Sequence, residues 1–325
     1  MKKWILLSII LATFINLVTF TTGGCKTDEP VLYIGFMVHL EGWDQEVTNQ
    51  DMFMHHAEAA RELASIFEEY EAKITFEARS EFVEGCMNWN DNVLLELYNR
   101  GHGIGVHADV GGGRENLTQL SFASQISIMK QEMERLTGLE ILHVSGICSE
   151  LDWVKAGIDA GYKFATGTIG YCAMSMPVDE RPLEYRDCPN PGECHGVIPV
   201  ELVDRVNPWK TSTGRHWLDH DPGGEFVILS ESGVLENLAE YVKGEGSSGG
   251  EFTRADIDVY IEMLEEALTY TKDGQTTFLY VGLSIGSPEI HEYMYKEWLA
   301  AIKPYVDSGQ VEWKTLPEIY SAYLE

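Results

Sequence analysis

The sequence predicts an α/β protein in which seven or eight mostly parallel strands alternate with helices and curl into a distorted (β/α)7-8 barrel. First, strand-like and helix-like segments alternate along most of the chain, which is typical of a parallel sheet. Second, Val31 to Val38 is a nearly continuous apolar run, as expected for a strand buried on both faces. Third, the 300 residues after Cys25 contain no second long apolar run and suit one barrel, over 26–325.

The predicted elements follow that first strand in order. Helix 52–70 places Phe53, Ala57 and Leu63 on one face, which is the apolar spacing of a helix packed on a sheet. The other predicted strands are 74–77, 103–107, 139–147, 162–169, 226–229, 277–283 and 311–316. The other predicted helices are 92–99, 120–136, 152–160, 235–242, 256–270, 293–305 and 318–324.

The β-α alternation is interrupted between residues 170 and 225. This stretch is rich in Pro, Gly, Trp and charged residues and has little periodicity. Long irregular segments of this kind in a compact domain are usually functional, so we expect an elaborated insertion there. A second break, the Gly- and Ser-rich run 244–250, has the composition of a flexible linker.

Residues 1–25 predict export rather than fold. Lys2 and Lys3 precede an uncharged, mostly apolar run over 4–20, and Gly-Gly-Cys25 ends the segment. A charged start, an apolar centre and small residues before a cleavage point describe a secretory signal. Cys25 after Gly-Gly resembles a bacterial lipoprotein processing site, at which Cys25 would be lipidated. An uncleaved signal anchor is the alternative, and both predict a domain outside the cytoplasm that meets the membrane only through this segment.

The charge balance restricts the partners. The chain has 23 basic and 52 acidic residues and a formal net charge of −29. A surface of that sign repels nucleic acid and anionic lipid, so we expect neither as a ligand.

Five cysteines follow Cys25, and an exported protein is expected to use them in disulfides. Cys188 and Cys194 flank a turn-rich stretch that suits a small disulfide loop. Cys148 and Cys172 could form a second bridge. The sequence alone does not fix the pairing.

Candidate chemistry lies at the carboxyl ends of the predicted strands, where barrels of this kind carry their active sites. His39 and Glu41 end the first strand, and His107 and Asp109 end the third. In extended chain, residues two apart point to the same face. The two pairs could therefore supply four ligands to a divalent metal, and imidazole with carboxylate favours zinc. Glu77 ends the second strand and is a further candidate general base.

One of these segments also carries a family resemblance. Arg100-Gly-His-Gly-Ile-Gly-Val-His107 is similar to the Gly-His-x-Ile-Gly-x-His segment of the NodB-homology polysaccharide deacetylases (carbohydrate esterase family four), in which the last His binds metal. The likeness runs in order over most of 31–325. It implies a deacetylase / glycoside hydrolase type of barrel, with His107 as a metal ligand and Glu41 in place of the family's metal Asp.

The chain also departs from the family pattern. The catalytic base of the family falls at Leu40, which cannot take a proton, and the second metal His falls at Gly111. Ser145-Gly146 stands where the family has an Arg, and Leu283-Ser284 where a late His is expected.

Three hypotheses follow from this combination. The first is an exported, metal-dependent deacetylase that removes acyl groups from a carbohydrate. The second is a metal-independent glycoside hydrolase that uses two of the carboxylates Glu41, Glu77 and Asp109. The third is a catalytically inactive barrel that binds carbohydrate.

Residues for sugar binding are predicted near the same end of the barrel. Trp43 follows the first strand, and His216 and Trp217 lie in the insertion. Flat aromatic faces with polar tips stack well on sugar rings. Arg79, which ends the second strand, could contact the substrate or pair with the acidic residues.

Overall fold

The computed structural model describes residues 30–41, 44–112, 116–198, 200–242, 252–283, 285 and 288–325. The export segment with Cys25, the linker 244–250 and Trp43 lie outside the described residues. Over the described part, the structure has no helix of the length and apolar character that crossing a membrane requires.

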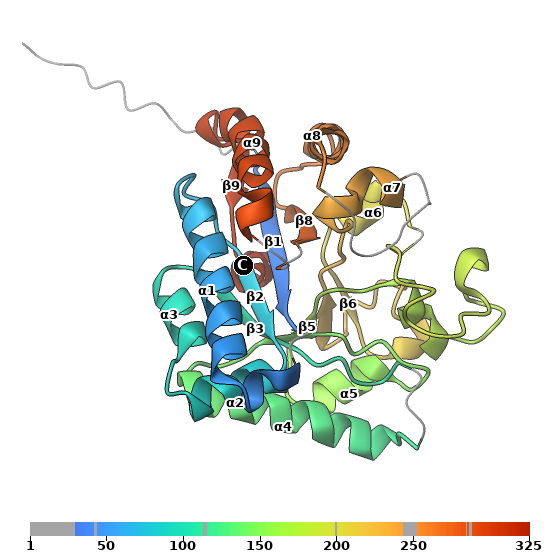
Figure 1. Cartoon of the computed structure of the whole chain (residues 1–325). Coiled ribbons are helices and arrows are strands. Elements are labelled where there is room, and N and C mark those ends of the chain that lie inside the picture. Colours follow the sequence, from blue (N-terminus) through green and yellow to red (C-terminus); the bar gives the residue numbers. More distant parts are fainter. Residues whose placement is uncertain are drawn as a thin grey trace, which may run out of the picture.

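Strand β1 (Leu32–Leu40) is the longest described strand of a curled, almost entirely parallel sheet (Figure 1). Within the described residues the strand order is β6-β7-β5-β4-β3-β2-β1-β8, and β9 pairs with the start of β1. Only the β6–β7 pair is antiparallel. The other strands are β2 (Thr75–Ala78), β3 (Gly103–His107), β4 (His143–Ser145), β5 (Phe164–Ala165), β6 (Trp209–Thr211), β7 (Phe226–Ile228), β8 (Thr277–Leu283) and β9 (Val311–Trp313).

The gap between β7 and β8 is bridged by the chain that follows β7. The Ser232 amide donates to the Tyr280 carbonyl at 3.0 Å, and the Gly282 amide donates to the Gly233 carbonyl at 2.9 Å. These bonds join β8 to the segment that follows β7 without a full strand. The predicted distorted barrel is thereby confirmed.

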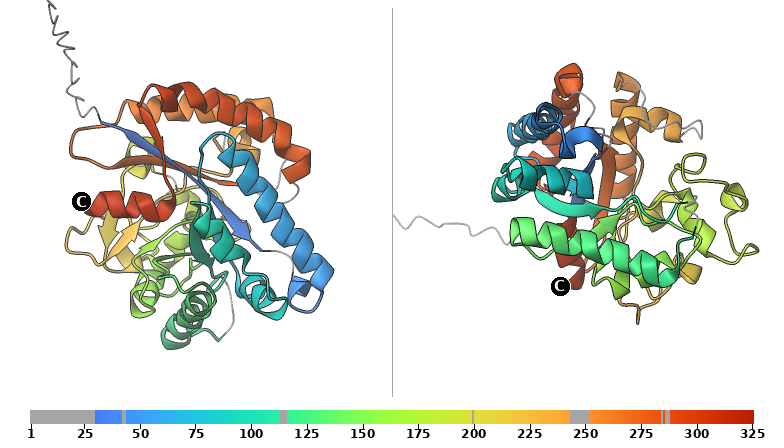
Figure 2. Two further views of the ribbon diagram at one scale, coloured as in Figure 1. Left: turned by 90° about the vertical axis from the view of Figure 1, so that its left-hand side faces the viewer. Right: turned by 60° about the horizontal axis from the view of Figure 1, so that its bottom comes forward.

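Helices cover the outer face of the sheet (Figure 2). Helix α1 (Gln50–Glu68) begins where the Asn49 side chain accepts a hydrogen bond from the Met52 amide, and it buries Phe53, Leu63 and Phe67. The other α-helices are α2 (Ser80–Asn88), α3 (Val93–Asn99), α4 (Gln119–Thr137), α5 (Trp153–Asp159), α6 (Leu202–Arg205), α7 (Leu238–Val242), α8 (Arg254–Leu268), α9 (Pro288–Asp307) and α10 (Leu316–Leu324). Helix α2 was not among the predicted elements.

Two layers of apolar side chains fix the barrel. Outside the sheet, Phe36 of β1 packs on Phe67 and Trp298, with ring centroids 5.3 and 4.7 Å apart. Inside the sheet, Met37 belongs to a smaller cluster that includes Leu316 and Ile319 of α10. Because α10 fills the lower interior, the open end of the barrel lies at the carboxyl ends of the strands.

Strands β4 and β5 are shorter than the predicted strands 139–147 and 162–169. Each is followed closely by a glycine with positive φ, Gly146 at 65° and Gly167 at 57°. A backbone turn of that kind favours glycine and ends regular pairing. The chain beyond each glycine therefore becomes a loop at the open end.

The segment 170–225 is largely irregular, as predicted. It contains short 3-10 helices at Gly170–Ser175, Leu183–Tyr185 and Gly214–His216, together with α6 and β6. Two further 3-10 helices lie at Asp44–Val47 and Leu235–Asn237. Both disulfides that the sequence suggested are confirmed, Cys148–Cys172 and Cys188–Cys194. The first ties the insertion to the loop after β4.

Candidate metal centre

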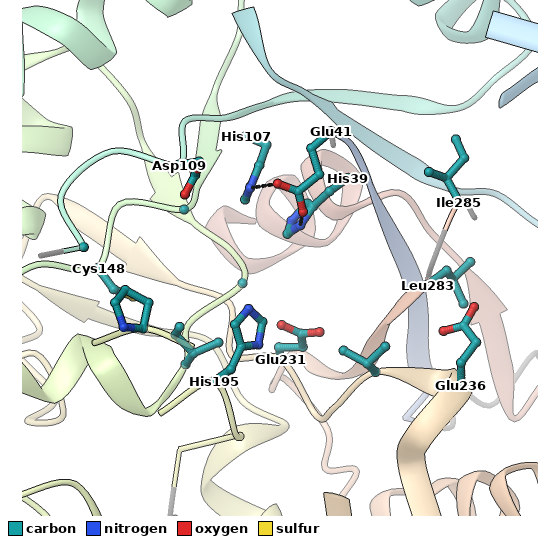
Figure 3. Close-up of a pocket in the computed structure, with 16 residues that line it drawn as sticks. His39, Glu41, His107, Asp109, Cys148, His195, Glu231, Glu236, Leu283 and Ile285 are labelled. Carbon is teal, nitrogen blue, oxygen red and sulfur yellow. Dashed lines mark ion pairs between the residues drawn. The ribbon is translucent and has the colours of Figure 1, made fainter. Parts of the chain in front are cut away.

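A cavity of about 530 Å³ opens at the carboxyl ends of the strands (Figure 3). Its walls come from the ends of β1, β3 and β8, the loops after β4, β5 and β7, and the insertion. The polar residues that line it are His39, Glu41, His107, Asp109, His195, Glu231 and Glu236. The four predicted metal ligands thus share one cavity with groups that the sequence analysis did not select.

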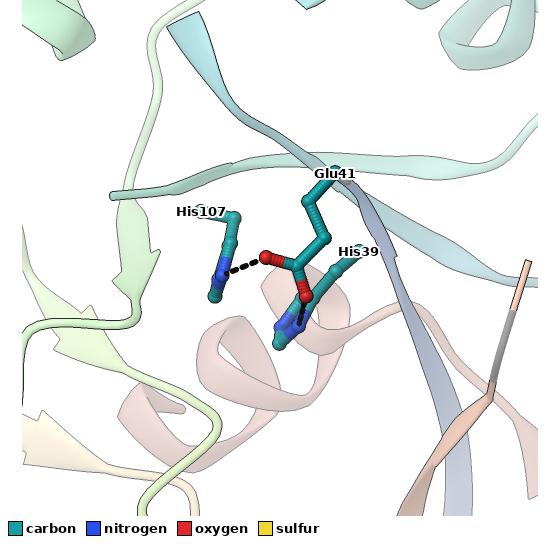
Figure 4. Close-up of side chains that lie close together, drawn as sticks. All are labelled: His39, Glu41 and His107. Atoms are coloured by element: carbon teal, nitrogen blue, oxygen red, sulfur yellow. Dashed lines mark ion pairs between the residues drawn. The ribbon is translucent and has the colours of Figure 1, made fainter. Parts of the chain in front are cut away.

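Three of the predicted ligands converge (Figure 4). Each of His39, Glu41 and His107 offers one donor atom, and these atoms all lie within 4.8 Å of one another. His107 Nε2 is 2.9 Å from Glu41 Oε2, and His39 Nδ1 is 3.5 Å from Glu41 Oε1. The two imidazoles stack with their centroids 3.7 Å apart. The carboxylate therefore faces one nitrogen of each ring.

The opposite nitrogen of each ring has its own partner. His39 Nε2 lies 3.2 Å from Glu77 Oε2, and His107 Nδ1 lies 2.8 Å from Ser145 Oγ. A proton on each of these nitrogens leaves a lone pair on His39 Nδ1 and on His107 Nε2, the two atoms that face Glu41. This is the way in which outer partners orient the histidine ligands of metal sites.

Glu77 is completely buried and does not line the cavity. Its Oε1 accepts a hydrogen bond from Thr166 Oγ1 at 2.6 Å and lies 3.1 Å from His143 Nε2. A side chain on Gly105 would collide with the His143 ring, so glycine in β3 gives this histidine its space. This placement favours a positioning role for Glu77 over the general-base role predicted from sequence.

The same contacts set the protonation of His39, His107, Glu41 and Glu77. Burial acts to lower the pKa of His39, but its hydrogen bonds to Glu41 and Glu77 outweigh burial and raise the pKa to about 10. Burial and the charge of His39 lower the pKa of His107. Burial acts against ionisation of Glu41 and Glu77, but their histidine partners hold the pKa of each carboxyl well below its usual range. Without an ion, the cluster holds anionic carboxylates against a protonated His39, so binding of an ion would release the His39 Nδ1 proton.

The donor chemistry fits a divalent transition metal. Two imidazoles and one carboxylate form a donor set of catalytic zinc sites, which keep a further position open for water or substrate. His39 and His107 lie on β1 and β3, and Glu41 directly follows β1. His39, Glu41 and His107 are the residues that would hold the ion.

Asp109, the fourth predicted ligand, lies on the same cavity outside this group of three. Its side chain is 53 % exposed, and its backbone has a φ of 46°, which turns it away from the line of β3. Arg79 Nη1 approaches Asp109 Oδ2 at 3.7 Å, and Arg79 Nη2 lies 3.1 Å from Glu81 Oε1. Arg79 is not among the lining residues, so the acid-pairing explanation of this residue describes its contacts better than substrate binding does.

The predicted sugar-binding residues of the insertion do not reach the cavity. Trp217 is 0 % exposed and packs edge-on against Trp153 at a centroid distance of 5.3 Å. This corrects the expectation that Trp217 stacks on a sugar, since its indole is a core group. His216 is half exposed, pairs with Glu180 at 3.1 Å and does not line the cavity.

Four residues near the site were not assigned to it from sequence: His143, Ser145, Glu231 and Glu236. His143 and Ser145 alternate along β4, and alternation places residues two apart on one face of a strand. That signal was present, but the sequence analysis predicted a longer strand over 139–147 and did not select these two residues for the site. Glu231 and Glu236 follow β7, and only the curling of the sheet brings them opposite β1.

No family model and no curated protein sequence matches the chain. Solved structures do. A probable polysaccharide deacetylase from Pseudomonas aeruginosa has a TM-score of 0.55 at 12 % identity, with 90 % of this chain and 91 % of that chain covered. Puue allantoinase has a TM-score of 0.52 at 12 % identity, with 91 % of each chain covered.

A 4-alpha-glucanotransferase from Thermococcus litoralis has a TM-score of 0.54 at 17 % identity. The match covers 90 % of this chain but only 40 % of the glucanotransferase. Identities this low describe architecture. The chain therefore has the distorted α/β-barrel fold of the polysaccharide deacetylases.

Proposed function

We propose that this protein is an exported, metal-dependent hydrolase that removes acyl groups from a carbohydrate. One observation carries the proposal: His39, Glu41 and His107 meet at the cavity floor with both imidazoles oriented from behind by Glu77 and Ser145. The fold shared with a probable polysaccharide deacetylase supports the substrate class. The two disulfides support export, because such bridges persist mainly in oxidising compartments.

The chain's own residues would each have a defined task. Glu41 and the two facing imidazole nitrogens would hold the ion, and Glu77 and Ser145 would keep the rings from rotating. A divalent ion in this position lowers the pKa of water and polarises an acyl oxygen. The cavity offers space beside the cluster, with Leu283 and Ile285 as apolar wall for the substrate.

A second candidate, carbohydrate binding without hydrolysis, has one observation in its favour. Leu40 stands where the resembling family carries its catalytic base, and it is completely buried. A buried apolar side chain can neither accept a proton nor contact water.

The metal-independent glycosidase has less support. That reaction needs two carboxylates flanking the scissile bond. Glu77 does not line the cavity, and both oxygens of Glu41 face imidazoles. The similarity to a glucanotransferase is a similarity of the barrel fold. It does not supply the missing pair of carboxylates.

The test combines metal analysis with product analysis. We expect the purified protein to hold about one equivalent of zinc or a similar ion and to release acetate from N- or O-acetylated oligosaccharides. The variant His107→Ala should lose both properties. His216→Ala, a histidine remote from the cavity, is the matched control and should retain them.

The outcomes separate the candidates. Metal-free protein that releases reducing sugar in the presence of chelator would support the glycosidase. Saturable glycan binding without any product would support the binding protein. Either result would contradict the deacetylase.

A further inference from the structure

Glu231 occupies the wall of the cavity opposite the metal centre. It lies three residues after β7 and is only 6 % exposed, yet it lines the cavity. Figure 3 shows Glu231 across the cavity from Glu41 and His39, with its carboxyl group turned into the cavity. A buried carboxyl that faces a cavity requires an explanation, because burial without a cationic partner is costly.

The fold holds this carboxyl group in place. The Gly282 amide donates to Glu231 Oε1 at 3.1 Å. A Cβ on Gly282 would lie 2.5 Å from the same oxygen, so only glycine leaves room for the carboxyl at this position of β8. The neighbouring residue Ser232 is anchored to β8 through the Tyr280 carbonyl. The position of Glu231 is thus set by backbone on both sides.

Amide hydrolysis needs a group that the metal cluster does not provide. The leaving nitrogen must receive a proton, because an amide anion is too basic to depart unaided. Glu41 is anionic with both oxygens directed at imidazoles, and His39 and His107 have each ring nitrogen engaged. These three residues are therefore unsuited to donate that proton.

We propose that Glu231 is the general acid that protonates the leaving nitrogen of the substrate. This role rests on the proposed function. A water molecule first loses one proton to solvent, and its oxygen then bonds to the acyl carbon. The carbon–nitrogen bond breaks as Glu231 gives its proton to the nitrogen. The products are an amine and a carboxylic acid, the acid loses its proton to solvent to become a carboxylate, and Glu231 regains a proton from solvent.

The surroundings of Glu231 favour the protonated carboxyl group that a general acid needs. Burial raises the pKa of Glu231 to about 7, the anionic charge of Glu77 adds to the rise, and the charge of His39 and the Gly282 hydrogen bond oppose it. Glu236 and His195 line the same cavity, and Tyr280 lies beneath it with its hydroxyl donated to the Leu229 carbonyl. A carboxyl with a pKa near the working pH suits general acid catalysis.

The test compares two leaving groups with the same acyl group. N-Acetylated chitooligosaccharide needs a protonated leaving nitrogen, whereas 4-nitrophenyl acetate releases a stable phenolate without protonation. We expect Glu231→Gln to lower kcat for the amide by about 100-fold or more, as loss of a general acid does, and to change aryl ester hydrolysis less than tenfold. Glu225→Gln, an exposed glutamate just before β7, is the control and should change neither rate.

The pH profile gives a second readout. Because the acid form of Glu231 is the active one, kcat/KM for the amide should fall as the pH rises through about 7 in the wild type. Glu231→Gln should lose this descending limb while retaining its metal content and Tm. Glu231→Asp should keep the limb at a reduced rate, which a packing role would not produce.

Three results would overturn the proposal or its basis, and they differ from one another. Equal losses on amide and aryl ester in Glu231→Gln would remove the general-acid role and leave the proposed function intact. A descending limb of kcat/KM that persists in Glu231→Gln would also remove the general-acid role and leave the proposed function intact. Wild-type protein that binds metal but hydrolyses neither substrate would overturn the proposed function and this role with it.

Discussion

Replacing Glu77 by glutamine tests whether the buried carboxylate orients the metal site. Glu77 lies within hydrogen-bond distance of Thr166 Oγ1, His143 Nε2 and His39 Nε2, at 2.6, 3.1 and 3.2 Å. In Glu77→Gln the side chain keeps one oxygen acceptor, but its amide NH₂ would face the His39 Nε2 proton. The ion pair with His39 is lost, and a buried contact to a charged group contributes about 1.5–3 kcal/mol of stability. The loss of an outer partner should also weaken zinc binding about 10- to 100-fold.

Urea unfolding at pH 7, after the metal has been removed with a chelator, measures the loss of stability. Competition with a chromophoric chelator measures the zinc affinity. The lowered pKa of Glu77 adds stability above its unfolded value of 4.5, and this contribution is lost as the pH falls through the folded pKa. The difference in free energy of unfolding between wild type and Glu77→Gln should therefore be complete at pH 7 and shrink below about pH 4.5. Unchanged zinc affinity in Glu77→Gln, with Glu225→Gln as control, would refute the positioning role.

Three further predictions concern the fold and the metal-free site. Trp217→Ala should lower the free energy of unfolding by about 3–5 kcal/mol, measured by urea, because a fully buried indole leaves a large cavity. Replacing both Cys148 and Cys172 by Ser should cost about 3–4 kcal/mol in the same assay, from a sequence separation of 24 residues. The pKa of His39 is raised to about 10, so its stabilising contribution is complete below pH 6.5 and is lost as the pH rises through 10. The Tm of chelated wild-type protein should therefore fall over this interval, and His39→Asn should show a smaller fall.

The order of elements could be predicted because it depends on local patterns. The apolar run of β1 and the helical face of α1 follow from their own residues, and both are present within two residues of the predicted bounds at the start of each element. The ends of β4 and β5 could not be placed, since they depend on glycines whose positive φ is set by tertiary contacts.

The metal centre was partly predictable for the same reason. His39 lies on β1, Glu41 directly follows that strand, and His107 ends β3, so parallel strand geometry brings the three to one edge of the sheet. Asp109 broke the expected alternation, because the chain turns at positive φ directly after β3. Glu231 lies 190 residues from Glu41, and only the closure between β7 and β8 places the two on one cavity.

The role of Trp217 shows the opposite limit. Trp217 was predicted to bind sugar because it lies in the irregular insertion and flat aromatic faces stack well on sugar rings. Trp217 instead packs with Trp153 and Trp209 in the protein interior. Sequence could not distinguish a stacking platform from a core group, because both use the same side chain.

Anomalous scattering at the zinc edge, from crystals grown with zinc, tests the central claim most directly. The account predicts one peak about 2.0–2.1 Å from His39 Nδ1 and from His107 Nε2, with a Glu41 oxygen as third ligand. Glu77 and Ser145 should remain on the far nitrogens of the two rings. A cavity without a peak, or a peak held by other residues, would contradict the account.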